Sequence, residues 1–170
     1  PANPGAAAVI GPDRISDQQL TEAVQTVLTA QGHPIDTENA TLTHKVLQRM
    51  VTMALVNQLA TRAGVVVTQG EIDRTYADYQ TQAGGAKQFD GLLLTQDIAP
   101  STAKDAVRLN IQASKLAATI SPGASNDVSS MQLVDTLSKY STLIGTSISP
   151  RYGTWDPTSL TIGALPTDLS

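Results

Sequence analysis

The segment that most constrains the fold is THKVLQRMVTMALVNQLATRAG, residues 43–64, which is apolar over more than half of a helix circumference. Together with the preceding leucine, its apolar positions are Leu42, Val46, Leu47, Met50, Met53, Ala54, Leu55, Val56 and Leu59. A helix with so wide an apolar arc is normally surrounded by other elements. The pattern therefore predicts a central helix, and Gly64 marks its end.

Five further segments show helical periodicity or helix-boundary residues. They are residues 17–32, 69–83, 86–98, 101–120 and 128–144. Thr68 and Glu71 have the spacing of a capping box, in which each side chain satisfies a free backbone N–H at the helix start. In the last helix we expect one inward stripe, formed by Met131, Val134, Leu137, Tyr140 and Ile144.

Two short segments outside these helices also carry apolar residues. The sequence AAAVIGPDRIS, residues 6–16, predicts a short strand or a small hairpin with its turn at Gly11-Pro12. Near the other end, SLTIGALP, residues 159–166, predicts a short strand. A lone strand leaves backbone groups unpaired, so we expect the two end segments to pair. The predicted fold is mainly α, with about six helices and a small two-stranded β element.

Length and composition narrow the functional classes. A chain of 170 residues is typical of one domain, which we place at residues 7–170 behind a flexible tether at 1–6. The start PANPGAAA has no Met, as after removal of a leader, although a frayed end explains it equally well. There is no cysteine, the net charge is −4, and neither a basic cluster nor an 18-residue apolar run is present. These features argue against thiol chemistry, nucleic-acid binding and a membrane span.

The segment ISPRYGTWDP, residues 148–157, contains two aromatic rings in a chain that has only six aromatic residues. Its prolines and glycine predict a loop. Tyr152 and Trp155 can cover a sheet edge or the ends of helices, because each has a large apolar ring and a polar atom. We expect Arg151 and Asp156 to pair across the turn. The four residues are interpreted as a structural clasp, with a partner-binding surface as the alternative.

Few residues suggest a chemical or binding site. Met50, Met53, Met131 and Tyr79 lie on apolar helix faces, where they can fill the core or form a deformable peptide-binding surface. Ser101 and Lys104 match Ser-x-x-Lys, but the companion motifs are absent and Ser101 is better explained as a helix N-cap. His33 and His44 lack the spacing of a zinc site. We therefore predict no catalytic residue, no metal and no cofactor.

The order of these features resembles a known family. VLQRMVTMALVNQLATRAGVVVTQGEIDRTY, residues 46–76, is similar to the N-terminal chaperone domain of the SurA, trigger-factor and PrsA group, and the likeness extends over residues 7–120. In SurA-like proteins an isomerase domain separates this block from a final helix, whereas here only SPGASN, residues 121–126, stands there. Residues 127–170 would then return to pack on the N-terminal strand. The ending resembles that of actinobacterial SurA-like lipoproteins.

The resemblance implies a function. We expect a non-enzymatic, exported chaperone that holds unfolded or extended polypeptides, anchored to the cell envelope through an N-terminal lipid. The alternative is an envelope scaffold lipoprotein that binds one specific protein partner. A hydrolase built on Ser101 is a third, minor possibility.

Overall fold

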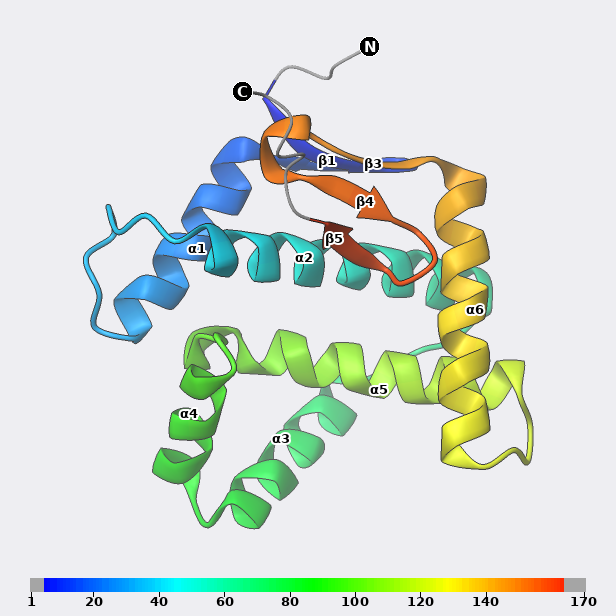
Figure 1. The fold of residues 1–170 in the computed structure, drawn as a ribbon. Helices are drawn as coiled ribbons and strands as arrows, with labels where there is room; N and C mark the ends of the chain where they lie inside the picture. The colour runs from blue at the N-terminus through cyan, green and yellow to red at the C-terminus, as the bar shows by residue number, and fades with distance from the viewer. Residues whose placement is uncertain (1–4, 164–170) are drawn as a thin grey trace.

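The computed structural model describes residues 5–163 and places α2 at the centre of the molecule (Figure 1). This stretch contains six α-helices, which confirms the mainly α prediction: α1 (Asp17–Ala30), α2 (Ala40–Arg62), α3 (Gln69–Ala83), α4 (Ala86–Thr95), α5 (Ala103–Ile120) and α6 (Asn126–Ile144). Two short 3-10 turns are also present: η1 (Pro100–Thr102) directly precedes α5, and η2 (Pro150–Tyr152) follows α6 in the C-terminal segment. Every helix in residues 5–163 is too short or too polar to cross a lipid bilayer.

The wide apolar arc of α2 is covered on several sides, as its sequence predicted. Its buried side chains are Leu42, Val46, Leu47, Val51, Leu55, Val56 and Ala60. They pack against α1, α5, α6 and strand β1. The helix begins three residues before the expected start because the Asn39 side chain accepts a hydrogen bond from the backbone N–H of Leu42.

A small antiparallel sheet covers the opposite side of α2 from α5 (Figure 1). Strands β1 (Ala6–Ile10) and β2 (Asp13–Ser16) form the predicted hairpin, with Gly11 at φ +56° in the turn. Strand β3 (Thr146–Ile148) pairs with the other edge of β1, so the order is β2-β1-β3. Strand β1 begins at Ala6, inside the range expected to be a tether, and residues 1–4 lie outside the described residues.

The pairing of the two ends is therefore present, but through a different segment from the one expected. The strand that reaches β1 follows α6 directly, and the sheet has three strands instead of two. The predicted final strand is β5 (Thr161–Gly163), which pairs with β4 (Thr154–Asp156) in a separate hairpin. Because α6 ends beside β1, the first residues after Gly145 reach its edge without a long connection.

Helices α3 and α4 form an arm that packs on α5 away from the sheet (Figure 1). The predicted capping box is present, since Thr68 and Glu71 exchange side-chain and backbone hydrogen bonds at the start of α3. The predicted stop is also present, because Gly84 ends α3 in the left-handed conformation at φ +96°. The arm therefore follows directly from local sequence signals.

The inward stripe predicted for α6 is wrong in its first half. Met131 and Val134 are exposed, at 73% and 45%, and the buried face is instead Leu133, Leu137, Tyr140 and Ser141. A helix turns about 100° per residue, so each step of three residues falls about 60° short of a full turn. Two such steps carry Met131 about 120° from Leu137, which takes it off the packed face.

Candidate functional site

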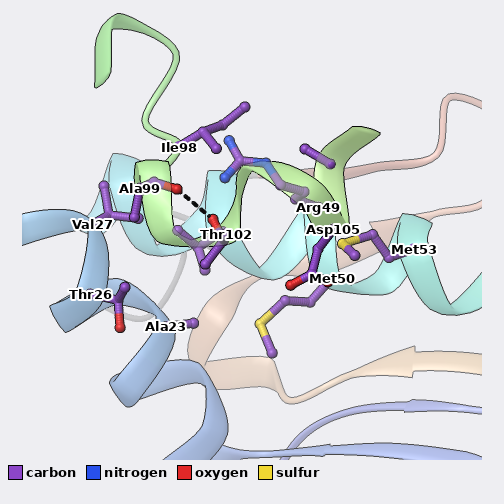
Figure 2. A pocket seen from close by; sticks show the side chains of 12 residues that line it. Ala23, Thr26, Val27, Arg49, Met50, Met53, Ile98, Ala99, Thr102 and Asp105 are labelled. Atoms are coloured by element: carbon purple, nitrogen blue, oxygen red, sulfur yellow. Dashed lines mark hydrogen bonds between the residues drawn. The ribbon is translucent and has the colours of Figure 1, made fainter. Parts of the chain in front are cut away.

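An apolar hollow lies between α1, α2 and the segment that joins α4 to α5 (Figure 2). Its volume is about 170 Å³. The lining residues are mostly apolar or small: Ala23, Thr26, Val27, Val46, Arg49, Met50, Met53, Ile98, Ala99, Thr102, Asp105 and Ala106. A hollow of this size accommodates one group about as large as a benzene ring.

One wall of the hollow is held in place by polar contacts to the loop after α4. Arg49 donates to the carbonyl oxygens of Asp97 (2.9 Å) and Gln96 (3.1 Å). The Asp97 carboxylate accepts from Lys45 and Gln31, each at 2.8 Å. These bonds attach the loop to α1 and α2, and Ile98 and Ala99 of this loop line the hollow together with the methionines of α2 (Figure 2).

Both ionisable groups at the centre of this attachment are shifted. Hydrogen bonds from Lys45 and Gln31 lower the pKa of Asp97 below its usual value of 3.8. Burial lowers the pKa of Arg49, while the nearby Asp97 carboxylate opposes that shift. Asp97 also has φ +58°, an unusual conformation for a residue with a side chain. The loop is thus fixed by its contacts instead of by its own backbone preference.

A second, more polar hollow of about 300 Å³ continues along α2 and α5. It is lined by Met53, Ala54, Asn57, Asp105, Arg108 and Gln112. Gln112 is 8% exposed and donates to the side-chain oxygen of Asn57 at 3.2 Å. Met53 and Asp105 line both hollows, so the two adjoin, and we call them together the groove, with an apolar end and an amide-lined end.

The structure brings together two of the four candidate binding residues. Met50 and Met53 line the apolar hollow. Met131 is exposed on α6, and Tyr79 lies in the arm, where its ring is 6.2 Å from that of Phe89. No ligand contact distinguishes these residues, so their role in peptide binding stays a prediction.

The four residues of the proposed clasp lie along the C-terminal segment. The Tyr152 hydroxyl donates to Asp17 at 2.8 Å, and the Trp155 indole donates to Ser141 at 2.9 Å. Arg151 lies 3.7 Å from Asp17, so the expected pair with Asp156 is wrong. Asp156 instead accepts from the Thr158 backbone and the Ser159 hydroxyl, which lower its pKa. These contacts attach the segment to α1 and α6.

Several residues of the groove were not identified from the sequence. Nothing in the sequence separates Arg49, Asn57 and Asp105 from the solvated faces of ordinary helices. The partners of Arg49 and Asn57 are 47 or more residues away, and Asp105 has none in the described residues. The one sequence signal for Arg49 and Asn57 was that polar residues occur within a helix as apolar as α2. It was too common a feature to single out any position.

The minor chemical motifs have other uses. Ser101 lies in η1, and Thr102 occupies the N-cap position of α5, so the N-cap role expected for Ser101 is wrong. Lys104 pairs with Asp73 at 2.9 Å and lies over the Tyr76 ring. In the part of the chain that the structure describes, no three His, Asp or Glu side chains form a group able to hold a metal ion.

Comparison with known families decides the relationship. The SurA N-terminal domain family matches residues 6–117, about two thirds of the chain. The chain belongs to the SurA N-terminal domain family. The match covers β1 to α5 and so includes both hollows, and it agrees with the resemblance found over residues 7–120. It identifies the chain as having a chaperone-type domain. Searches of curated proteins and of solved structures found no match.

Proposed function

We propose that this protein is a holdase, which binds unfolded or extended polypeptides in the groove along α2 without catalysing a reaction. The observation that carries the proposal is the apolar hollow beside Met50 and Met53 on a chaperone-type domain. An exposed apolar side chain of an unfolded client would be removed from water by entering this hollow. The amides of Asn57 and Gln112 lie farther along the same groove and offer hydrogen bonds to a client backbone.

The size of the hollow predicts weak and tolerant binding. Burial of one apolar side chain stabilises a complex by about 1.5–3 kcal/mol. Ordering an extended segment offsets part of that gain. Several low-affinity contacts are therefore expected, as suits a chaperone that must release its clients.

The test is suppression of aggregation with several unrelated unfolded proteins. We expect the wild-type chain to suppress it, and Met53→Gln to reduce the effect several-fold, because a polar amide would face the apolar hollow. Met131→Gln is the matched control, since Met131 is 73% exposed on α6. Equal loss in both variants would exclude the groove as the binding site.

A second candidate function is a scaffold that binds one specific envelope partner. It is favoured by the exposed apolar residues Val128, Met131 and Val134, which follow one another along α6. This function predicts no suppression of aggregation for any client. It also predicts a single stoichiometric partner in pull-down experiments, lost on Met131→Gln.

We also propose that the protein acts in the cell envelope, outside the cytoplasm. The support is the likeness to SurA-like lipoproteins and a composition poor in lysine and rich in serine and threonine. Fractionation of the native host cells tests the location. Recovery of the protein in the cytosol would contradict the proposal.

A further inference from the structure

One carboxylate stands at the junction of the two hollows. Asp105 lines both the apolar end and the amide-lined end of the groove. It makes no ion pair or hydrogen bond with any residue that the structure describes. Its place in the first turn of α5 favours an acidic residue through the helix dipole. Asp105 is exposed to solvent, so its charge is hydrated in the free protein and open to a bound partner.

The cations nearby do not neutralise this charge. Arg49 is the other charged residue of the apolar hollow, and its two terminal nitrogens donate to the carbonyl oxygens of Asp97 and Gln96. Figure 2 shows its guanidinium beside Ile98. Arg108 lines the second hollow only, and forms no ion pair with Asp105. The groove therefore combines apolar walls with the carboxylate of Asp105 at the junction and the guanidinium of Arg108 in the second hollow.

A side chain that complements both features has a long aliphatic stem and a cationic end. Lysine and arginine bury their methylene stems along apolar surface while the charged head remains near water. Such a stem would lie against Val46, Met50 and Met53, and the head would reach Asp105 at the junction. A purely apolar side chain would fill the hollow but leave the carboxylate unpaired, and an acidic side chain in the same position would place a second negative charge beside Asp105.

We propose that this groove selects polypeptide segments that present a lysine or arginine side chain, bound by its stem in the apolar hollow and by its charge at Asp105. The inference rests on the proposed holdase function and names the side-chain class that the groove prefers. It adds selectivity to an otherwise tolerant site.

Three capped, fluorescently labelled peptides test the preference. They share a Gly/Ser-flanked extended sequence and differ at one central position, which is lysine, norleucine or glutamate. Norleucine keeps the four-carbon aliphatic stem of lysine but carries a hydrogen in place of the ammonium group. In fluorescence anisotropy at 20 mM NaCl, we expect the lysine peptide to bind about two- to fivefold tighter than the norleucine peptide. The glutamate peptide should bind most weakly, and 500 mM NaCl should remove the lysine advantage.

Two variants locate the effect. Asp105→Asn should make the lysine and norleucine affinities equal. Asp127→Asn removes the same charge from the first turn of α6, outside the groove, and should keep the lysine preference. A lysine preference that survives Asp105→Asn, or that is lost equally in Asp127→Asn, would overturn the inference and show attraction to the net negative charge only.

The outcomes also separate this inference from the proposed function. If norleucine binds as tightly as lysine and Met53→Gln weakens both, the groove binds polypeptides but the selectivity is refuted. If no peptide binds and no client is protected from aggregation, both proposals are refuted together.

Discussion

At the scale of single residues, Asp97 does most to shape the groove. Its carboxylate accepts from Lys45 and Gln31, and its backbone carbonyl accepts from Arg49. Three side chains from α1 and α2 thus converge on one residue of the loop that walls the hollow. Because the carboxylate is stabilised in its charged form, its pKa is lowered, and the attachment depends on pH.

The sign of that dependence follows from the direction of the shift. A lowered folded-state pKa means that the ionised carboxylate contributes stability above its usual pKa of 3.8. That contribution is lost as the pH falls from 3.8 through the lower folded-state value. Asp97→Asn removes it at every pH. The pair is partly exposed, so we expect a loss of about 1 kcal/mol at pH 7.

Thermal unfolding of the wild type and of Asp97→Asn from pH 7 to pH 2 measures this difference. The melting temperatures should differ by about 2–4 °C at pH 7 and converge in acid. A gap that persists unchanged at pH 2 would show that the carboxylate charge is not the stabilising feature.

At the scale of elements, the arm of α3 and α4 is attached to α5 by two ion pairs of different exposure. Lys115 contacts Glu71 at 2.5 Å and also donates to the Val66 carbonyl oxygen. Lys104 contacts Asp73, with both side chains more than half exposed. Hydrogen bonds from these lysines are the largest cause of the lowered pKa of Glu71 and of Asp73.

This difference predicts unequal effects of two matched substitutions. Lys115→Met should lower the free energy of unfolding more than Lys104→Met does, because Lys115 bonds both to Glu71 and to the Val66 carbonyl oxygen and its ion pair is the less exposed of the two. Hydrogen exchange of the α3 and α4 amides, followed by mass spectrometry, measures how firmly the arm is held. Equal exchange in the two variants would contradict the ranking.

The elements also show what could be predicted from sequence. Capping residues, glycine stops and periodicity are local signals, so the α3 boundaries and the β1–β2 hairpin were correctly predicted. Met50 and Met53 were chosen because apolar residues on one helix face are visible in the sequence. The β1–β3 pairing was not predicted because Thr146–Ile148 has no strand signal of its own. These residues form a strand because the end of α6 places them beside β1. The Asp97 contacts join residues 48 to 66 positions apart, and no local pattern reveals them.

At the scale of the whole molecule, the two ends of the described chain meet on α2. Strand β1 lies between β2 and β3, so residues from both ends complete one sheet (Figure 1). Gln58 of α2 joins these parts, since its amide donates to Ile10 and Asp13 and accepts from the Tyr140 hydroxyl. The helices that form the groove are thereby fixed from the side opposite α5.

The C-terminal segment contributes to this arrangement through Trp155. Its ring packs against the core, and its indole N–H donates to Ser141, which is 1% exposed. Trp155→Ala removes the ring and leaves a buried hydroxyl without its donor, so we expect a loss of about 2–3 kcal/mol in unfolding free energy. Leu143→Ala is the control on α6, the helix that carries Ser141. Because Leu143 is 79% exposed, this substitution should lower the unfolding free energy by less than about 0.5 kcal/mol. Urea unfolding followed by circular dichroism measures both variants. If Trp155→Ala is as stable as Leu143→Ala, Trp155 does not brace α6, and the C-terminal segment is held by the β1–β3 pairing and by the contacts of Tyr152 and Arg151 with Asp17.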